Sequence, residues 1–283
     1  MTIAISAASG KLGSAIIDAC IALAPEQTIV ALARTPKRVL QQGIEVRPGD
    51  YNDLEQLKMS LRGVDSLLLV SGMDAPDKRI IQHRNMIQAA QFAGVKKIVY
   101  TSVQGSEKDT AFSPVIKSNR QTEKDVQESG LAFVIGRNGI YIEPDIEYIE
   151  NYVKEGGIVN CADDGKCGYT TRTELGFAYA KMLIESKHNS QIYNLNGEAI
   201  TQYQLADYLN QAFGTQLSYK PISVVQYRQQ RIDELGDFIG AIIGGIYQGI
   251  REGKADNPSH YFQAAGRAHI DWQTYFDKLK STL

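Results

Sequence analysis

Small residues stand at a spacing suited to phosphate binding close to the start of the chain. Ala7, Gly10 and Gly13 occupy the G-x-x-G-x-x-G spacing within "AISAASGKLGSAII" (residues 4–17). In such a turn the middle glycine lets the backbone approach a pyrophosphate, and the last glycine lets the following helix pack close to the strand. The start of that helix, residues 11–14, would offer free N–H groups to phosphate. By itself the motif is weak, because any strand–turn–helix can carry two glycines.

Ala7 takes the place of the usual first glycine. Alanine keeps the side chain small, which suits the turn if the backbone there does not need a positive φ. We therefore expect a working pyrophosphate cradle whose backbone differs from the usual pattern at this one position.

The second predicted strand ends in a basic residue. Arg34 stands where an NAD-dependent enzyme would place an acidic residue to hold the ribose 2′-hydroxyl. Arginine suits a 2′-phosphate instead, with Lys37 or Arg38 in support. A solvated basic loop is the alternative interpretation. Together with the glycine turn, Arg34 predicts NADP(H) as the cofactor.

A common proton donor of carbonyl reduction is absent from the sequence. In a Tyr-x-x-x-Lys pair the lysine lowers the tyrosine pKa, so that the phenol can protonate a carbonyl oxygen. None of the 15 tyrosines has a lysine four residues later. Ser102, at the end of the fifth predicted strand, therefore lacks the tyrosine partner of such a triad, and alcohol dehydrogenation by that triad is disfavoured.

The elements that must position these residues alternate through the first half of the chain. Apolar, β-branched runs alternate with helix-period segments, which implies right-handed βαβ units. Strands are predicted at 2–6, 28–33, 44–47, 65–71, 96–102 and 131–137, and helices near 11–24, 53–61, 78–93 and 118–129. This order predicts an α/β fold with a Rossmann-type, doubly wound parallel sheet.

The pattern changes after about residue 140. Helices are predicted near 146–155, 173–186, 202–213, 224–236 and 271–280, with one more strand at 191–196. We expect an NADP-binding core of residues 1–140, to which strand 191–196 contributes. The remaining residues, 141–283, are expected to form a mostly helical carboxy-terminal substrate lobe interleaved with that core.

One apolar stretch, "FIGAIIGGIYQGI" (238–250), is shorter than the roughly 20 residues needed to cross a bilayer. We expect a helix over a pocket or at a subunit contact, which leaves a homodimer open, and no membrane span.

Composition excludes several classes of protein. The 283 residues are 43% hydrophobic with a net charge of −2, which gives no reason to expect a nucleic-acid partner. Three cysteines without a paired framework, four scattered histidines and the lack of a signal peptide predict a reduced, cytoplasmic protein without a metal. Hydrolase and kinase interpretations lose support because the sequence lacks a Gly-x-Ser-x-Gly elbow and a Walker loop.

Several segments together resemble the NmrA-like family of atypical short-chain dehydrogenases. They are "SAASGKLG", "ALARTPKR", "RPGDYND", "LLLVSG", "QHRNMIQAAQFAGVKKIVYTS" and "RNGIY". Within that family the chain is most similar to the NADPH-dependent quinone and triphenylmethane reductases. The resemblance implies an NADPH-binding Rossmann domain with a small lobe over the nicotinamide. It also implies that Arg137–Ile142 border the nicotinamide and that Arg172 lies near the cofactor.

The candidate cofactor-binding residues follow from these arguments. Asp50 and Tyr51 are candidates for the adenine side, and Ser71 and Gly72 end the fourth predicted strand at the crevice. The full candidate set is Ala7, Ser9, Gly10, Lys11, Leu12, Gly13, Arg34, Lys37, Asp50, Tyr51, Ser71, Gly72, Arg137, Asn138, Gly139, Ile140, Tyr141 and Arg172.

Lys117 is the one candidate for a proton donor. It lies in "SPVIKSNRQTEKDVQESG", which resembles the catalytic-lysine segment of plant NmrA-like reductases. The alternative is a solvated residue just ahead of a helix, and the quinone and dye reductases do not keep a lysine there.

Other residues have a structural interpretation beside the functional one. Tyr141 is the best candidate to position an acceptor, although aromatic residues of this kind more often belong to the core. Phe238, Ile242, Tyr247 and Trp272 are further candidates of the same kind. His83 is expected to be a structural histidine, and Cys161, Asp163 and Asp164 are expected in a surface loop.

The function predicted from these residues is NADPH-dependent reduction of a quinone-like or other conjugated, electron-poor acceptor. Such an acceptor takes hydride readily, so the enzyme mainly has to hold it near the nicotinamide while solvent supplies the proton. A non-catalytic NADP(H)-binding redox sensor is the alternative. Carbonyl or epimerase chemistry through Lys117 is a third, weaker hypothesis.

Overall fold

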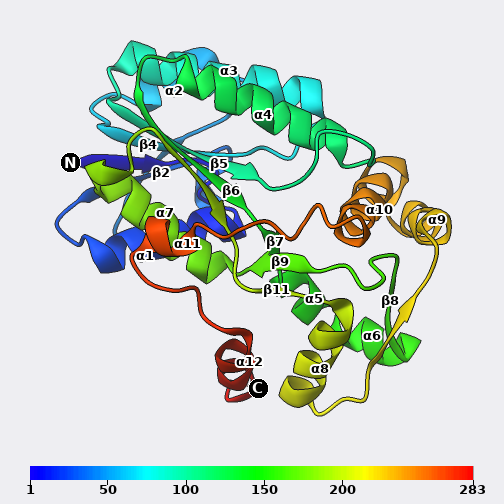
Figure 1. The fold of residues 1–283 in the computed structure, drawn as a ribbon. Helices are drawn as coiled ribbons and strands as arrows, with labels where there is room; N and C mark the ends of the chain where they lie inside the picture. The colour runs from blue at the N-terminus through cyan, green and yellow to red at the C-terminus, as the bar shows by residue number, and fades with distance from the viewer. Residues whose placement is uncertain (283) are drawn as a thin grey trace.

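A seven-stranded parallel sheet lies at the centre of the fold (Figure 1). The structure is a computed structural model that describes residues 1–282 of the chain. The strand order is β10-β6-β5-β4-β1-β2-β3. The strands are β1 (Thr2–Ile5), β2 (Thr28–Ala33), β3 (Glu45–Pro48), β4 (Ser66–Val70), β5 (Lys97–Val103), β6 (Ala132–Asn138) and β10 (Gln191–Leu195). The order reverses at β1, which confirms the predicted doubly wound sheet and places a crevice at the carboxyl ends of β1 and β4.

Helices cover both faces of this sheet because successive side chains of a strand point to opposite faces. Ile3 and Ile5 pack in one core and Ala4 packs in another. The first core contains residues of α1 (Lys11–Leu23) and α7 (Arg172–Ile184). The second contains residues of α2 (Leu54–Ser60), α3 (Pro76–Ala93) and α4 (Ser113–Gln127).

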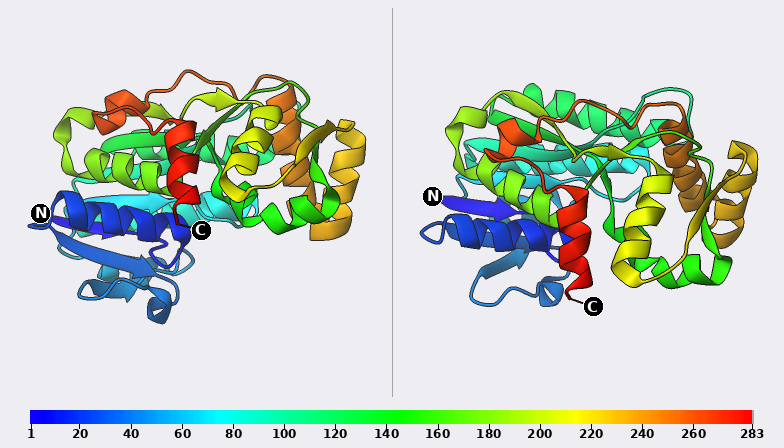
Figure 2. Two further views of the ribbon diagram at one scale, coloured as in Figure 1. Left: turned by 90° about the horizontal axis from the view of Figure 1, so that it is seen from below. Right: turned by 60° about the horizontal axis from the view of Figure 1, so that its bottom comes forward.

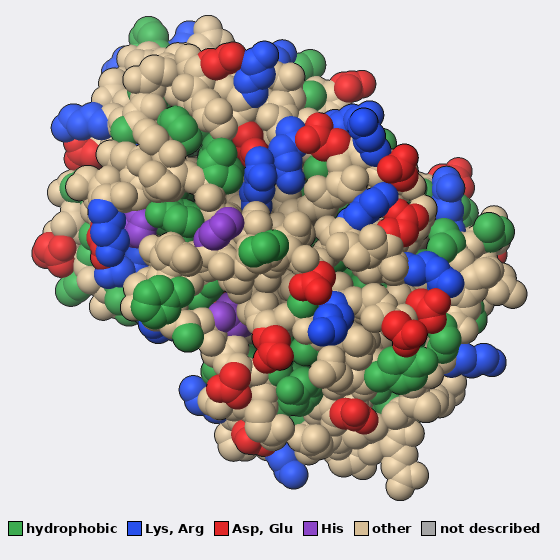
Figure 3. All heavy atoms as spheres, viewed as in Figure 1, with side chains coloured by type: hydrophobic (Ala, Val, Ile, Leu, Met, Phe, Trp, Pro, Cys, Tyr) green, Lys and Arg blue, Asp and Glu red, His purple; other side chains and the backbone are tan. Residues whose placement is uncertain are grey.

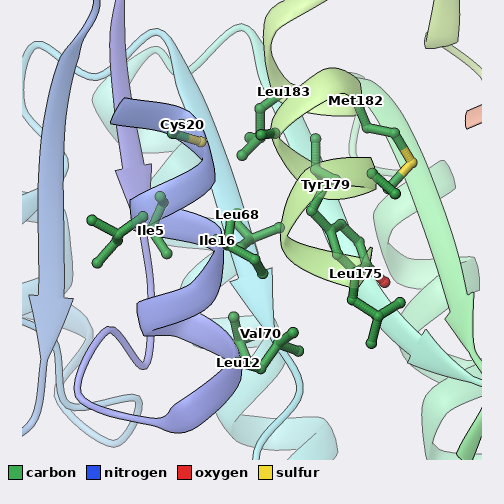
Figure 4. Packing of buried hydrophobic residues seen from close by; sticks show 14 of the residues in the cluster. Ile5, Leu12, Ile16, Cys20, Leu68, Val70, Leu175, Tyr179, Met182 and Leu183 are labelled. Atoms are coloured by element: carbon green, nitrogen blue, oxygen red, sulfur yellow. The ribbon is translucent and has the colours of Figure 1, made fainter. Parts of the chain in front are cut away.

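Helix α1 packs against α7 (Figure 4), and one glycine makes this close contact possible. A Cβ on Gly176 would lie 2.6 Å from the Ala15 carbonyl oxygen, so any larger residue would push the two helices apart. Leu12 and Ile16 of α1 and Leu175 and Tyr179 of α7 fill the core beneath this contact. The helix that carries the expected cradle is therefore fixed by a helix that begins at Arg172.

The carboxy-terminal lobe lies at the end of the sheet where the crevice opens (Figure 2). Its core contains Tyr169, Leu205, Leu209, Trp272 and Phe276. The lobe helices are α5 (Glu143–Glu147), α6 (Ile149–Glu155), α8 (Gln202–Phe213), α9 (Val224–Leu235), α10 (Asp237–Arg251) and α12 (Trp272–Lys280), while α11 (Tyr261–Ala265) packs on α7. Two single turns of 3-10 helix, η1 (Pro36–Arg38) and η2 (Ser186–His188), complete the helices.

The lobe contains more strands than the sequence predicts, so the expectation of one further strand after residue 140 is wrong. The short strands are β7 (Ile140–Tyr141), β8 (Gly157–Asn160), β9 (Cys167–Thr170), β11 (Ala199–Ile200) and β12 (Ser218–Pro221). They form a three-stranded sheet, β11-β9-β7, and a pair, β12-β8. Strands of two to four residues show too few alternations to be recognised in a sequence.

The apolar stretch 238–250 lies within α10, which packs side by side with α9 (Figure 1). Its glycines permit close contacts, because a Cβ at Gly240 would strike the backbone of Arg231 in α9. A Cβ at Gly245 would strike the backbone at Ala111 and Phe112, just before α4. Among the helices of residues 1–282, none combines the length and apolar character required to cross a membrane. A homodimer through α10 stays a prediction.

Candidate cofactor and acceptor site

The glycine turn joins β1 to α1 at the crevice. Ala7 has φ 48°, in the left-handed region, so the condition under which alanine suits this turn, a backbone without a positive φ, is not met. The Gly10 N–H donates to the Ala7 carbonyl at 2.9 Å, and the Ala8 N–H donates to Leu32 of β2 at 3.0 Å. These bonds hold the alanine in a conformation that costs it about 1–2 kcal/mol.

Gly13 is the position in the turn that leaves no room for a side chain. A Cβ there would lie 2.5 Å from the Ala7 carbonyl oxygen, whereas one on Gly10 would lie 3.2 Å from the same atom. Gly10 caps α1 without a side-chain hydrogen bond, and no acidic residue occupies the first turn. The N–H groups in the first turn of α1 are therefore free to bind an anion. Ser9 and Lys11 are exposed beside this turn, whereas Leu12 is buried.

Arg34 lies exposed directly after β2, and Lys37 and Arg38 lie exposed in η1 beside it. Within residues 1–282 Arg34 has no carboxylate within ion-pair distance and donates no side-chain hydrogen bond. A cation without a partner at the second strand tip fits the 2′-phosphate assignment.

The two candidates for the adenine side differ in the structure. Tyr51 is 9% exposed, and its hydroxyl bonds the Ser6 hydroxyl at 2.5 Å and the Val70 carbonyl at 2.8 Å. Burial raises the Tyr51 pKa above its usual range. The Tyr51 side chain thus links the ends of β1 and β4 inside the core and is not exposed to contact an adenine ring. Asp50, half-buried and bonded to the Asn52 N–H at 2.9 Å, is the accessible candidate.

His83 orders the backbone at the end of β4. Its Nε2 accepts the Gly72 N–H at 3.0 Å, and its Nδ1 bonds Thr122 Oγ1 at 2.9 Å. Burial lowers the His83 pKa to about 3, so the ring is neutral and Nδ1 carries the proton. The Ser71 N–H is held in the same way by Thr101 Oγ1 at 2.9 Å. This is the arrangement of a structural histidine that sets the lining of the crevice.

A buried carboxylate that the sequence analysis missed lies at the ends of β5 and β6. Glu123 is 3% exposed and accepts hydrogen bonds from Ser102 (2.6 Å), Arg120 (2.6 Å) and Arg137 (2.6 and 3.0 Å). Burial raises the Glu123 pKa, but the Arg137 hydrogen bonds and the Arg120 charge outweigh burial and hold the pKa below its usual value. Arg137, expected beside the nicotinamide, is thus engaged in an internal ion pair.

Glu147, a second missed residue, links the lobe to the cradle. This α5 carboxylate accepts from Lys11 Nζ at 2.7 and 2.8 Å and from Arg172 Nη1 at 2.9 Å. The Arg172 N–H donates to Glu143 Oε1 at 2.6 Å. Lys11 and Arg172 are therefore brought together beside the cradle, where both could contact a bound pyrophosphate.

Tyr141 lies in β7, with its hydroxyl accepting from Asn138 Nδ2 at 3.1 Å. The Asn138 amide is oriented by the Tyr179 hydroxyl, which donates to Asn138 Oδ1 at 2.6 Å. Burial raises the Tyr141 pKa to about 12. A phenol with that pKa is a weak proton donor at neutral pH, so Tyr141 is better suited to packing and positioning than to acid catalysis.

Lys117 lies on the exposed face of α4. The structure corrects the expectation that it precedes the helix, since α4 begins at Ser113. Lys117 shares one exposed stripe with Lys124 and Glu128, while Asn119 and Glu123 face the sheet. Within residues 1–282 no hydrogen bond or ion pair connects Lys117 to the residues of the cradle.

A narrow pocket lies between the ends of the strands and α10. Gln104 and Gly105 after β5, Gly139 after β6, and Gly245 and Gly249 of α10 line it. Ile140 and Ile246 contribute apolar walls. Gly139 has no room for a Cβ, which would strike the Gly168 carbonyl. This pocket adjoins the half of the crevice on the far side of the cradle from Arg34.

The other candidates for contact with an acceptor are not among the residues that line this pocket. Trp272 is 1% exposed and donates to the Glu198 carbonyl at 2.8 Å, so it is a core residue of the lobe. The Tyr247 hydroxyl faces Asp145 at 3.4 Å, in the lobe interior. Phe238 is 46% exposed at the start of α10, and Ile242 is half-buried one turn later. Sequence periodicity could not reveal that the face of α10 toward the pocket consists of glycines and Ile246.

The loop with two cysteines differs from the expectation. Asp163 and Asp164 lie at its surface, with Asp163 paired to Arg251 at 2.8 Å. Cys161, however, is fully buried. The expectation of a surface position is wrong for this residue. Residues 1–282 contain no group of three metal-ligating side chains.

The cradle fits a dinucleotide phosphate on three observations of this chain. Gly13 is excluded from carrying a side chain, the first turn of α1 is uncapped, and Arg34 is exposed without an ionic partner. Basic side chains are otherwise interspersed with acidic ones on the face seen in Figure 3, which shows no extended patch of one sign.

Comparisons with known proteins agree with this geometry. A family model described as NAD(P)H-binding matches residues 7–157. Quinone oxidoreductase 2 of Escherichia coli is 36% identical over 229 residues, covering 80% of this chain and 79% of that protein. The NmrA-like family domain-containing oxidoreductase flvB of Aspergillus flavus is 32% identical over 228 residues, covering 77% of this chain and 74% of that protein.

Two solved structures cover nearly the whole chain and contain the cofactor. The E. coli quinone oxidoreductase QOR2 complexed with NADPH has a TM-score of 0.88 and 31% identity, covering 98% of this chain and 99% of that chain. The Citrobacter sp. triphenylmethane reductase complexed with NADP(H) has a TM-score of 0.88 and 29% identity, covering 99% of this chain and 100% of that chain.

Proposed function

The chain belongs to the NmrA-like family of NAD(P)H-binding reductases, and we propose that it passes hydride from NADPH to a quinone-like or other conjugated, electron-poor acceptor. Its relatives include reductases of quinones and triphenylmethane dyes and an NAD(P)H azoreductase from Xenophilus azovorans. The overall reaction with a quinone is NADPH plus quinone plus a proton, giving NADP⁺ and hydroquinone.

The cradle, Arg34 and the pocket share the tasks of binding. The first-turn N–H groups of α1, with Lys11 and Arg172, would hold the pyrophosphate. Arg34 and Lys37 would hold the 2′-phosphate, with Asp50 on the adenine side. Ser71, Gly72 and residues 138–140 would line the nicotinamide half. When bound, NADPH supplies the hydride from its nicotinamide ring.

The observation that carries the proposal is a pocket with walls suited to positioning, in which Lys254, held in ion pairs with Glu252 and Asp109, is the one ionisable residue among those that line it. Gly139, Ile140 and Ile246 offer apolar contact to a flat acceptor. Tyr141 has a pKa of about 12, and Lys117 lies on the outer face of α4. An acceptor that becomes protonated by water therefore suits this site better than one that requires a strong enzymic acid.

Steady-state oxidation of NADPH with a panel of quinones, azo dyes and triphenylmethane dyes tests the proposal. We expect turnover with at least one class and a dependence of the rate on acceptor concentration. Measured NADPH binding without turnover of any acceptor would contradict it.

A redox sensor is the second candidate, because the missing Tyr-x-x-x-Lys pair suits binding without catalysis equally well. A sensor should bind NADP⁺ and NADPH with similar affinity and show no turnover. Isothermal titration with both cofactors, beside the acceptor panel, separates the two functions.

Chemistry through Lys117 remains the third hypothesis, and its exposed position gives it less support. Lys117→Ala should abolish activity if this lysine is the acid, whereas we expect the variant to keep wild-type rates.

A cytoplasmic location stays a prediction. The three cysteines are free and buried.

A further inference from the structure

Gln104 connects the ends of β5 and β6 beneath the pocket. It directly follows β5, and its backbone N–H donates to the Asn138 carbonyl at 2.9 Å. The residue is one of those that line the pocket, together with Gly139 and Ile140, although it is only 7% exposed. A polar side chain buried to this extent needs partners for both its oxygen and its nitrogen.

The orientation of the Gln104 amide is fixed by the Asn196 side chain and by backbone carbonyl groups. Asn196 Nδ2 donates to the carbonyls of Gly197 (3.0 Å) and Asn257 (3.3 Å), so Asn196 Oδ1 must be the acceptor end of that amide. Gln104 Nε2 donates to Asn196 Oδ1 at 2.8 Å and to the Arg137 carbonyl at 3.1 Å. Exchanging the two ends of the Gln104 amide would place its oxygen against two other acceptors, Asn196 Oδ1 and the Arg137 carbonyl.

Gln104 Oε1 is consequently a fixed acceptor, and it has no hydrogen-bond partner within residues 1–282. An unpaired buried acceptor is unfavourable, because it has lost its hydrogen bonds to water without gaining a partner in the protein. The fixed polarity also determines what could satisfy it, since only an N–H or O–H donor can bind to this atom. A quinone carbonyl cannot.

The position of Gln104 indicates where such a donor would come from. A dinucleotide with its 2′-phosphate at β2 and its pyrophosphate at β1 extends its nicotinamide half toward β4, β5 and β6. Gln104 lies at the ends of β5 and β6, against the pocket under α10. A ligand in this half can bring two kinds of donor, the carboxamide NH₂ of the nicotinamide and the hydroxyl of a reduced acceptor.

We propose that Gln104 is a positioning residue whose Oε1 accepts a hydrogen bond from an N–H or O–H donor of the bound ligand. The inference rests on the proposed function, because it requires the nicotinamide half of the cofactor at this end of the sheet. Through this hydrogen bond Gln104 would orient either the nicotinamide ring or the acceptor ring for hydride transfer.

The first experiment compares NADPH with its 3-acetylpyridine analogue, in which a methyl group replaces the carboxamide NH₂. Wild-type protein should bind NADPH roughly tenfold more tightly than the analogue, as expected for one hydrogen bond to a buried acceptor. In Gln104→Met this preference should fall below about twofold, because both ligands then lack the bond. Affinity for 2′,5′-ADP, which lacks the nicotinamide, should be the same in both proteins.

The second experiment tests the hydroxyl as donor. Hydroquinone and its dimethyl ether are compared as inhibitors of wild-type protein and of Gln104→Met. A preference for hydroquinone that disappears in the variant, with no preference between NADPH and its analogue, assigns the bond to the reduced acceptor.

Gln202→Met is the matched control. Gln202 is fully buried in the lobe, accepts from Asn160 Nδ2 and donates to the Tyr169 hydroxyl, each at 2.9 Å. Its replacement should lower the melting temperature without changing either ligand preference. A loss of preference in this control as well would mean that destabilisation alone explains the Gln104 result and would overturn the inference.

The wild-type measurements also decide the matter without any variant. Equal affinity for both members of each ligand pair would overturn the role of Gln104, while NADPH binding and turnover would still support the proposed function. Failure to bind both 2′,5′-ADP and NADPH would instead contradict the cofactor site of the proposed function.

Discussion

Arg34 is the residue on which we propose that the choice of cofactor depends, because it is an exposed cation directly after β2. Arg34→Ala should weaken NADPH binding by about 1–3 kcal/mol, the range for a hydrogen bond to a charged group. NADH binding should change little, since NADH has no 2′-phosphate. Titration calorimetry with both cofactors measures the difference, and Arg62→Ala, at an exposed position after α2, is the control. Equal losses for NADPH and NADH would refute the assignment.

The two glycines of the cradle should respond differently to substitution. Gly13→Ala places a Cβ 2.5 Å from the Ala7 carbonyl, so we expect a loss of about 1–3 kcal/mol in the free energy of unfolding together with weakened NADPH binding. Gly10→Ala places its Cβ 3.2 Å from the same atom and should cost less. Urea denaturation of both variants measures the two losses in the free energy of unfolding. A larger loss for Gly10→Ala than for Gly13→Ala would mean that the turn rearranges around Gly13.

At this scale the sequence predicts residues that act locally and misses those that act through distant partners. The spacing of Gly10 and Gly13 and the position of Arg34 are visible in the first 34 residues. The Lys11–Glu147 pair joins residues 136 apart, and the Gln104–Asn196 bond joins residues 92 apart. No local pattern records such pairs, because the topology of the sheet brings them together. Ala7 is a further case, since its positive φ follows from hydrogen bonds to the neighbouring strand and not from its own preference.

Helix α10 forms one wall of the pocket in which we propose that the acceptor binds. Gly249 lines the pocket, and a Cβ there meets no atom within 4 Å. Gly249→Leu should therefore fold normally and, because a helical glycine is unfavourable by about 1 kcal/mol, should not lower stability. We expect kcat/KM to fall most for bulky acceptors while the Kd for NADPH stays unchanged.

Gly245→Ala provides the contrast within the same helix. Its Cβ would strike the backbone at Phe112, so this smaller substitution should destabilise the protein. A Gly249→Leu protein with unaltered rates for small and large acceptors alike would show that the acceptor binds elsewhere.

The elements themselves were predicted to different degrees. The parallel strands and the long helices of the core have strong periodicity, and their order determines the sheet. Helix 146–155 is instead two helices that meet at Tyr148, and α4 begins five residues early, at Ser113, with Pro114 in its first turn. Proline is favoured in a first turn because its missing N–H needs no partner there. Such boundaries depend on local chemistry that periodicity does not detect.

For the molecule as a whole, Asp145 makes folding depend on pH. Asp145 is 5% exposed and accepts from the Tyr152 hydroxyl at 2.7 Å, and burial raises its pKa from 3.8 to about 6. Below pH 3.8 the carboxyl is protonated in both states, so its contribution to stability is fully present. As the pH rises through about 6, the unfolded state is already ionised and that contribution is lost.

Asp145→Asn should remove this dependence. Relative to wild type, the variant should gain roughly 2–3 kcal/mol in the free energy of unfolding between pH 4 and pH 7, on the scale of 1.36 kcal/mol per pKa unit. Urea denaturation at a series of pH values measures the gain, with Asp164→Asn as an exposed control. A constant difference between variant and wild type across this range would contradict the assignment.

We propose that NADPH held across the sheet reduces an acceptor beneath α10. The most direct test of this proposal is an anaerobic single turnover, in which protein saturated with NADPH is mixed with excess quinone and the absorbance of the reduced nicotinamide is followed. We expect complete loss of that absorbance, at a rate that rises and saturates with quinone concentration and exceeds the rate in free solution. Reduced cofactor that persists on the protein, with every acceptor of the panel, would contradict it.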